Sequence, residues 1–388
     1  MKTINKQPKI RFKGYTDEWQ QRKLNEFMDF SNGINAPKEN YGKGRKMISV
    51  MDILSPNKIT YQNIRNSVSV SEAIESKNKV ENGDLIFVRS SEIVQEVGLS
   101  KAYTDSEYAL YSGFSIRGKR KAEYNPLFME INLNNGAGRK QIERKAGGST
   151  RFNVSQEILN SIDVLMPIYE EQNKIADVFE NINNTIALHQ RKLEALEKTK
   201  KSFLQKMFPK KDETKPEIRF AGFTDDWEQR KFEDVLVSHP SKDYLAEPEE
   251  NGVFTVIQQG EKPVVGLANG EPFKDYCSVV LFGDHTVSLY KPTTPFFVAT
   301  DGLKILSSIE LRSDYLYTTL EIYKPKPQGY KRHFTLLKKN FFKFTKNTEE
   351  QQKIGNFFKQ LDDTIALHQR QLEVLKNMKT SFLQKMYI

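Results

Sequence analysis

The sequence of 388 residues has a single cysteine, Cys277, and lacks any long uncharged run. One cysteine cannot form an intrachain disulfide, so the framework typical of small secreted domains is excluded. No stretch approaches the ~18–20 apolar residues of a membrane-spanning helix, and the start MKTINKQPKIRF lacks the apolar core of ~7–15 residues that a signal peptide needs. These absences predict a cytoplasmic protein.

Catalytic signatures are also missing: there is no Gly-x-Ser-x-Gly, His-Glu-x-x-His or Cys-x-x-Cys motif. The tetrad 125–128, NPLF, differs at its third position from the Asn-Pro-Pro-Phe of adenine methyltransferases, and no glycine-rich motif precedes it. Residues 143–145, ERK, end like a nuclease metal site but lack the upstream Pro-Asp pair. We therefore predict no catalytic residues, no metal site and no bound cofactor. A stand-alone DNA methyltransferase or nuclease with a divergent site stays the alternative.

The chain is basic, with a net charge of +9 and a pI of about 9.2. Such a balance favours a polyanionic partner such as nucleic acid, although an ordinary basic protein has the same signature. The length suits two or three domains.

Two blocks of sequence occur twice. Residues 8–24, PKIRFKGYTDEWQQRKL, share 11 of 17 positions with residues 216–232, PEIRFAGFTDDWEQRKF, and each copy holds one of the two tryptophans, Trp19 and Trp227. Residues 170–207 share 23 of 38 positions with residues 349–386. The stretches between the blocks, 25–169 and 233–348, do not align convincingly. The sequence therefore predicts two differently specialised domains mounted on one duplicated frame.

This order sets the expected domain boundaries. We expect a first globular domain over 1–169, a long helix over 170–208, a linker over 209–215, a second globular domain over 216–348 and a second long helix over 349–388. Pro209 and the charges of FPKKDETK fit a solvated linker.

The second block of each half predicts a coiled-coil helix. Apolar residues recur at alternating steps of four and three, which is a period of 3.5. A helix of 38 residues spans about 57 Å, more than one turn of B-DNA at ~34 Å. The expected pairing positions are Ile182, Ile186, His189, Leu193 and Leu196 in the first helix, and Leu361, Ile365, His368, Leu372 and Leu375 in the second.

Polar residues interrupt this seam. His189 and His368 could form a metal site or proton relay, but a polar pair that fixes helix register is the favoured interpretation. We expect Lys200 and Lys379 to extend out of the seam into solvent.

The variable stretches contain short β-prone runs at 46–54, 84–90, 252–260, 277–283, 285–290 and 295–300, with turn signals at Asn82-Gly83-Asp84 and Gly283-Asp284. We expect mixed α+β domains with twisted sheets. Polar and basic loop residues could contact bases or phosphates. The candidates are Arg89, Ser90, Ser91, Arg139, Lys140, Gln141, Ser149, Thr150 and Arg151 in the first domain, and Gln258, Gln259, His285, Thr286, Lys331, Arg332 and His333 in the second.

The order of these motifs resembles the specificity subunits of Type I restriction-modification systems. The resemblance rests on the opener Ile-Arg-Phe-x-Gly-aromatic-Thr-Asp-x-Trp (10–19 and 218–227), on Glu-Glu-Gln-x-Lys-Ile before each helix (170–175 and 349–354), on the exit 147–172 and on GDHT at 283–286. It covers nearly the whole chain. The second half departs from the family at the end of its globular domain, where FFKFTKNT (341–348) replaces a proline-rich lead.

The resemblance implies a non-catalytic reader of double-stranded DNA. Each target-recognition domain would read one half of an asymmetric, bipartite site, and two antiparallel helices would set the spacer. Two modification subunits, which hold S-adenosylmethionine, would dock on the frame. Restriction subunits, which use ATP and Mg²⁺, would join through them.

Overall fold

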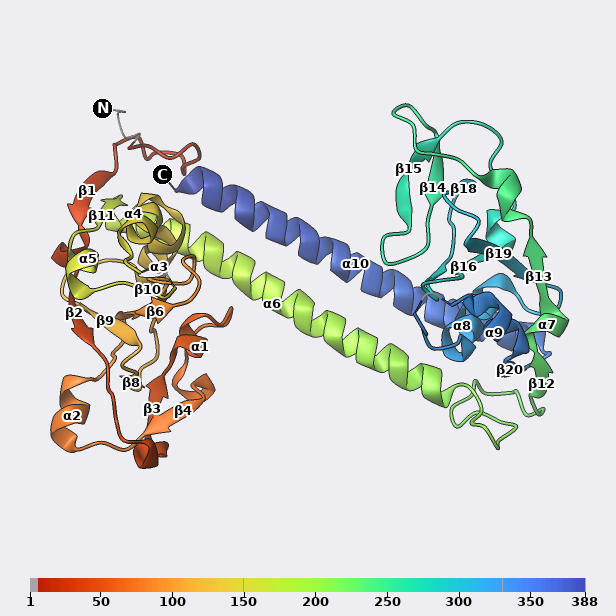
Figure 1. Cartoon of the computed structure of the whole chain (residues 1–388), viewed down its shortest axis with the longest axis horizontal. Coiled ribbons are helices and arrows are strands. Elements are labelled where there is room, and N and C mark those ends of the chain that lie inside the picture. The colour runs from red at the N-terminus through yellow and green to blue at the C-terminus, as the bar shows by residue number, and fades with distance from the viewer. Residues whose placement is uncertain (1–5, 149, 330, 388) are drawn as a thin grey trace. The chain divides into compact units, whose positions relative to one another are not determined.

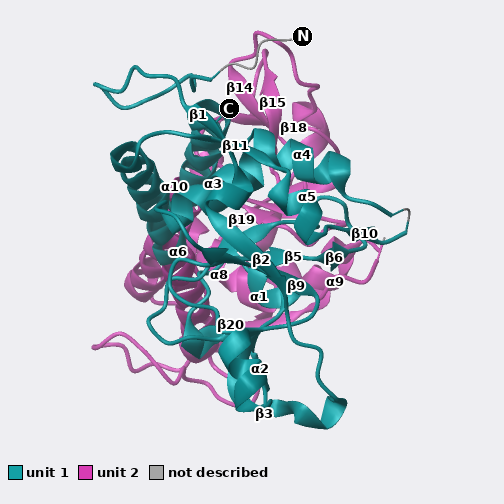
Figure 2. Ribbon diagram, turned by 90° about the vertical axis from the view of Figure 1, so that its left-hand side faces the viewer, with its two compact units in different colours: residues 1–188, 372–388 teal, residues 189–371 magenta. Residues whose placement is uncertain are grey.

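The structure, a computed structural model, describes residues 6–148, 150–329 and 331–387. The chain divides into two compact units (Figure 1, Figure 2): unit 1 holds Met1–Leu188 and Leu372–Ile388, and unit 2 holds His189–Gln371. Each unit combines helices with small sheets, which confirms the predicted mixed α and β class. Within the described ranges, no helix is long and apolar enough to cross a membrane.

Among the described residues of unit 1, five short α-helices and eleven strands precede the long helix. The helices are α1 (Val50–Ile53), α2 (Glu72–Lys77), α3 (Pro126–Asn135), α4 (Ala137–Lys145) and α5 (Gln156–Asn160). The strands are β1 (Gln20–Lys23), β2 (Met28–Asn32), β3 (Tyr41–Ile48), β4 (Asn66–Val68), β5 (Leu85–Val88), β6 (Ser90–Ser91), β7 (Ser100–Ala102), β8 (Leu110–Tyr111), β9 (Ser115–Arg120), β10 (Phe152–Asn153) and β11 (Asp163–Met166).

Unit 2 has a shorter inventory. Its helices are α7 (Phe232–Val235), α8 (Ser313–Tyr323) and α9 (His333–Lys339). Its strands are β12 (Glu228–Lys231), β13 (Leu236–His239), β14 (Phe254–Ile257), β15 (Val264–Ala268), β16 (Val280–Gly283), β17 (Leu289–Tyr290), β18 (Phe296–Val298), β19 (Leu303–Ser308) and β20 (Phe341–Phe344).

The sheets of the two units share one topology. Unit 1 has an antiparallel sheet in the order β2-β9-β5-β7, and unit 2 has one in the order β13-β19-β16-β17. In β4-β3-β8 and in β15-β14-β18, the middle strand is antiparallel to the first strand and parallel to the last. The opener strand pairs with the exit strand both times, as β1-β11 and as β12-β20.

This shared topology corrects the expectation that the two variable stretches, 25–169 and 233–348, are unlike in structure. The variable stretches have diverged beyond alignment, yet they build the same sheets. Strand pairing and alternating burial fix a β topology, whereas many different apolar side chains can fill its core. The pairing of β20 with β12 also explains the unusual FFKFTKNT segment. It supplies the exit strand, and Asn347 Oδ1 then accepts the backbone N–H groups of Glu349 (3.0 Å) and Glu350 (3.1 Å) at the start of the next helix.

The expected β-run at 46–54 is only partly a strand. β3 ends at Ile48, and α1 follows at once. Ser49 N–H and its hydroxyl both donate to Asp52 Oδ2 (2.8 and 2.7 Å), so Asp52 satisfies the backbone N–H of the residue that precedes the helix. The turn expected at Gly283-Asp284 does lie between two antiparallel strands, β16 and β17.

The long helices are α6 (Tyr169–Lys206) and α10 (Thr348–Met386), and each contributes one part to each unit. Within unit 2 the two helices run antiparallel, because the residues of α6 with rising numbers contact residues of α10 with falling numbers. His189 meets His368, Lys200 meets Asp362, and Phe203 meets Phe357. This confirms the predicted antiparallel pairing. The helices end slightly before the expected 208 and 388, since Met207, Phe208 and Tyr387 leave the helix and are buried.

The linker after α6 is tied down by one lysine. Lys343 Nζ on β20 donates to the carbonyl oxygens of Lys210 (2.8 Å), Lys211 (2.6 Å) and Glu213 (2.6 Å). An ammonium group has three donors, and here they hold one turn of backbone.

We expect Lys343→Met to loosen this linker. Loss of three charge-assisted hydrogen bonds should raise the rate of tryptic cleavage after Lys210 and Lys211 by at least about tenfold. Limited proteolysis followed by mass spectrometry measures it. Lys346→Met is the matched control, since exposed Lys346 pairs only with Glu228 among the ion pairs of the described chain. Equal cleavage rates in the two variants would contradict a role for Lys343.

Candidate functional site

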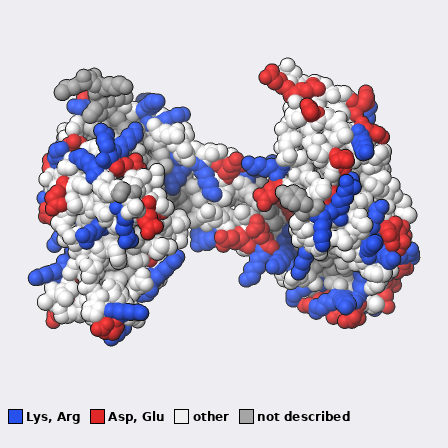
Figure 3. Space-filling view, in the orientation of Figure 1, with Lys and Arg blue, Asp and Glu red and all other residues white. Residues whose placement is uncertain are grey.

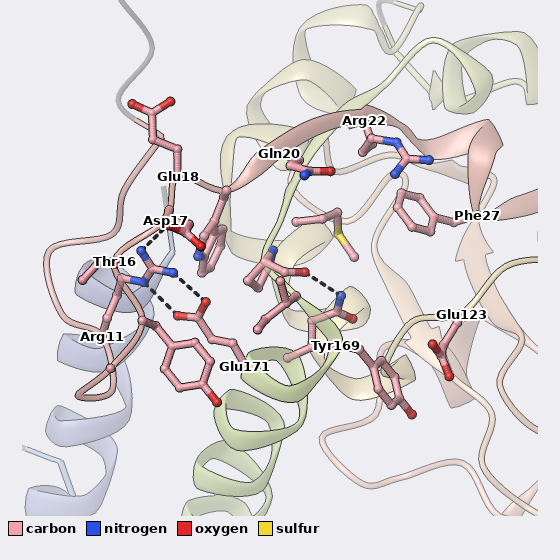
Figure 4. Close-up of a pocket in the computed structure, with 17 residues that line it drawn as sticks. Arg11, Thr16, Asp17, Glu18, Gln20, Arg22, Phe27, Glu123, Tyr169 and Glu171 are labelled. Atoms are coloured by element: carbon pink, nitrogen blue, oxygen red, sulfur yellow. Dashed lines mark hydrogen bonds and ion pairs between the residues drawn. The ribbon is translucent and has the colours of Figure 1, made fainter.

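Each opener is fastened to a long helix by a buried ion pair, and Figure 4 shows the pair of unit 1. Arg11 donates to Glu171 through Nε (2.9 Å) and Nη2 (2.7 Å), and Arg219 donates to Glu350 through Nε (2.6 Å) and Nη2 (2.9 Å). Both carboxylates are fully buried. The hydrogen bond to Glu171 raises the pKa of Arg11, as that to Glu350 does for Arg219. The bidentate geometry therefore holds the opener rigidly on the helix.

The two tryptophans belong to the cores of the units. Trp19 packs edge-on against Phe128 and Tyr387, with ring centroids 5.7 and 6.2 Å apart. Trp227 packs against Phe208 (5.2 Å) and Tyr315 (6.2 Å). The repeated opener is thus structural, which directs the search for a site to the loops that differ between the units.

In unit 1, three chain segments meet where strand β5 ends and strand β9 begins. Arg89, Ser90 and Ser91 follow β5, Phe114 precedes β9, and Arg151 precedes β10. Arg89 N–H donates to Phe114 O (2.9 Å), and β6 pairs with β10 through Ser90 and Ser91. We call Arg89, Ser90, Ser91, Phe114 and Arg151 the unit 1 rim. A hollow of about 370 Å³ opens beside it, lined by Val50, Ser90, Ser91, Glu92, Ile93, Glu96, Phe114 and Arg151.

The other candidates of the first domain lie elsewhere. Arg139 is buried, and its guanidinium donates to Val97 O (2.8 Å), Val94 O (3.0 Å) and Glu143 (2.8 Å). Gln141 binds both backbone groups of Asp163 through its amide. These two side chains stabilise α4, so Arg139 and Gln141 are no longer candidates for DNA contact. Lys140 and Thr150 are exposed but outside the rim, and Ser149 lies outside the described residues.

In unit 2, the corresponding strand ends also bring polar residues together. Gln259 Oε1 accepts the backbone N–H of His285 (3.0 Å), and Thr286 Oγ1 lies 2.8 Å from Ser288 Oγ. Val287 has a φ of 57°, a left-handed conformation that is strained for a β-branched residue and is held by the turn around it. Lys331 and Arg332 are exposed just before α9. We call Gln259, His285, Thr286, Lys331 and Arg332 the unit 2 rim.

His333 supports this rim from beneath. It is fully buried, its ring Nδ1 lies 2.9 Å from Asp284 O, and its Nε2 accepts Gln328 N–H. Its backbone N–H also donates to Asp284 O (2.8 Å), so α9 begins beside the 284 turn. His333 therefore positions the unit 2 rim and is no longer a candidate for DNA contact. The side-chain amide of Gln258, which is not part of the rim, donates to Lys262 O (3.0 Å).

The two rims occupy equivalent places in the shared topology. β5 pairs with β9 as β16 pairs with β19, which aligns Val88 with Gly283. The next residue makes the same backbone hydrogen bond both times: Arg89 N–H to Phe114 O, and Asp284 N–H to Gly302 O. Ser90 and Ser91 therefore correspond to His285 and Thr286. Sequence reasoning found most of these residues as polar loops but missed Phe114, whose signal is an aromatic residue directly after a turn glycine.

All ten residues expected in the seam between the long helices are at least partly buried. Ile182 and Ile365 are buried, while Ile186, His189, Leu193, Leu196, Leu361, His368, Leu372 and Leu375 are partly buried. Lys200 does not extend into solvent as expected, because it bridges Glu321 (2.7 Å) and Asp362 (2.6 Å). Lys379 is also partly buried, and this burial lowers its pKa.

His189 and His368 face each other with 2.9 Å between their Nδ1 atoms. One ring must donate and the other accept, so each needs its partner. We expect His189→Leu alone to lower the free energy of unfolding by about 1 kcal/mol, because the ring of His368 loses its hydrogen bond. The double variant His189→Leu/His368→Leu should recover or exceed the original stability. Thermal unfolding followed by circular dichroism measures both, and additive losses would contradict this coupling.

The motifs that resemble catalytic signatures have structural roles. Asn125 caps α3 by accepting Phe128 N–H (3.0 Å), with Pro126 as the first helical residue. Glu143 accepts from Arg139, and Lys145 Nζ donates to Ser161 (2.7 Å). Among the described residues, no group of three or more His, Cys, Asp and Glu side chains is placed to hold a metal ion.

Comparisons with known proteins agree on one family. Residues 16–198 match the model of the Type I restriction modification DNA specificity domain. A putative type I restriction enzyme MjaX specificity subunit from Methanocaldococcus jannaschii is 25% identical over 405 residues, covering 95% of this chain and 92% of the relative. The crystal structure of a Type I restriction-modification S subunit from M. genitalium has the same fold, with a TM-score of 0.69 at 14% identity, covering 98% of this chain and 99% of that one.

Proposed function

Because this chain belongs to the family of Type I restriction-modification specificity subunits, we propose that it reads one asymmetric, bipartite DNA target for a modification complex. It is the non-catalytic recognition component of that complex. The observation that carries the proposal is the pair of rims: the same backbone site occurs once in each unit, with different side chains. Two recognition sites that share a backbone arrangement but differ in their side chains suit two half-sites of different sequence.

The rim residues have the chemistry that DNA readout requires. Arginine and lysine bind guanine edges or phosphates, glutamine can bind adenine in a bidentate manner, and serine and threonine accept or donate to several bases. Figure 3 shows basic and acidic side chains interspersed over the visible face of each unit, without one large field of a single sign. Recognition therefore depends on local groups such as Arg151, Lys331 and Arg332 more than on the net charge of +9.

The duplicated frame suits two copies of one partner. Ile10 and Ile218 occupy the same opener position and are 38% and 36% exposed, and Leu188 and Leu367 occupy the same helix position and are 44% and 50% exposed. Apolar side chains that stay exposed at both equivalent places favour two identical modification subunits. These subunits would carry S-adenosylmethionine, and restriction subunits using ATP and Mg²⁺ would join through them. The cytoplasm, where DNA is accessible, is the proposed location.

The domain roles follow from this assignment. Residues 1–169 and 216–348 are the two target-recognition domains, and residues 209–215 are the linker. Helices α6 and α10 set the distance between half-sites. The β1-β11 and β12-β20 ladders support boundaries near these positions, because they join each opener to its exit strand.

Methylation mapping tests the proposal. A host that expresses this chain with its modification subunit should carry N6-methyladenine in a bipartite motif with two different halves. The modification subunit without this chain should leave that motif unmethylated, and the purified chain alone should show no methylation or cleavage of DNA. A palindromic motif, or activity of the isolated chain, would overturn the assignment.

A further inference from the structure

Apolar side chains are exposed around the hollow beside the unit 1 rim. Phe114 is 57% exposed, and Ile93, which lines the same hollow, is 50% exposed. Met51, the neighbour of the lining residue Val50, is 62% exposed. Clustered apolar side chains at the edge of a hollow indicate a contact surface more than isolated ones do.

The backbone presents Phe114 on a rigid loop. Gly113 N–H donates to Ile34 O (2.8 Å), Arg89 Nη1 donates to Gly113 O (3.2 Å), and Ser115 N–H donates to Ser112 O (2.9 Å). A Cβ atom on Gly113 would come within 1.9 Å of Asn35 Oδ1, so Asn35 packs closely against this loop. The guanidinium of Arg151 lies 6.0 Å from the centre of the Phe114 ring. Such an aromatic is held in place before any ligand arrives.

The charges around the hollow select base edges over phosphates. Glu92 and Glu96 line it together with Arg151, and Glu96 accepts the Ser91 hydroxyl (2.7 Å). Carboxylates repel the DNA backbone, whereas the floor of the major groove carries no net charge. There, the group that suits an exposed aromatic or aliphatic side chain is the 5-methyl of thymine.

Building on the proposed function, we propose that Phe114 is a specificity-determining residue that contacts a thymine 5-methyl group in the half-site read by unit 1. The equivalent place in unit 2 has Gly302 where unit 1 has Phe114, and it is surrounded by Gln259 and His285. Unit 2 therefore reads through hydrogen bonds, while unit 1 adds an apolar contact. The two rims share a backbone site but use different physical forces for discrimination.

Replacing thymine by deoxyuridine tests this directly, because it removes only the methyl group. The complex of the full chain with its modification subunit is assembled on duplexes in which each thymine of the mapped site is replaced in turn. We expect one position in the unit 1 half-site to lose affinity about fourfold, the value of one buried methyl. Phe114→Ala should weaken binding and abolish the difference between thymine and deoxyuridine at that position. Phe114→Leu should retain much of it.

Phe341→Ala is the matched control. Phe341 is also 57% exposed and has a lysine, Lys231, 5.6 Å from its ring centre, but it lies on β20. This variant should keep the full discrimination. A half-site without thymine on either strand, or equal affinity for both bases at every position, would overturn the role of Phe114 while leaving bipartite methylation intact. Loss of binding to the modification subunit in Phe114→Ala would instead assign Phe114 to a protein contact and overturn it too.

Discussion

Replacing Glu171 by alanine will lower the free energy of unfolding by about 3–5 kcal/mol, since it leaves the guanidinium of Arg11 without its buried partner. Glu171 is fully buried and Arg11 is 12% exposed, so water cannot restore the lost interaction fully. Glu350→Ala should have a similar effect through Arg219 in unit 2. Chemical denaturation, with tryptophan fluorescence reporting on Trp19 and Trp227, measures both.

Two further variants separate charge from packing. The double variant Arg11→Met/Glu171→Met should recover most of the loss, because an apolar pair of similar volume has no unpaired charge. Asp363→Ala, which removes the exposed pair with Lys359, should change stability by less than about 0.5 kcal/mol. A loss as large in the double variant as in Glu171→Ala would show that shape, and not charge pairing, fastens the opener.

Exchanging the variable stretch of unit 1 for that of another family member will change one half of the methylated motif completely and leave the other half unchanged. The structure gives the boundaries for such an exchange. The ladder of β1 with β11 closes where Leu24 N–H donates to Ile162 O (2.9 Å), so residues 27–161 can be replaced while both ladder strands remain. A family member with the same opener and exit strands supplies the replacement.

Methylome sequencing of the host reads the result. The matched exchange in unit 2 replaces residues between β12 and β20 and should alter the other half only. Changes in both halves after a single exchange would contradict independent readers. An altered spacer length with intact half-sites would mean that the variable stretch also affects the helices.

The sequence predicted the frame well because the frame is repeated. Identical positions in the two copies exposed the opener and the helix, and the 3.5-residue period predicted their pairing with His189 opposite His368. The shared sheet topology could not be predicted. Strand order depends on hydrogen bonds between segments far apart in sequence. The apolar sequences of strands such as β5 and β16 do not indicate which strands pair with them.

Single site residues were harder to predict than clusters. Arg139 and His333 have the residue types of DNA contacts, but burial assigns them to the support of loops, and a sequence does not show burial of a polar side chain directly. Lys200 was misplaced because Glu321, which pairs with it, lies 121 residues away in sequence. Phe114 was missed because exposed aromatics look like core residues until the fold places them at a surface.

The burial of Met386 and Tyr387 in the core of unit 1 has a consequence for the order of events during synthesis. Tyr387 packs against Trp19, Phe128 and Phe179, and Lys385 O accepts the N–H of Ile10. A chain leaving the ribosome therefore completes residues 189–371 before its amino-terminal core has all its parts. Domains usually finish folding from the amino terminus onward. Here the first unit to begin is the last to close, and until then Trp19, Phe128 and Phe179 lack the ring that packs against them.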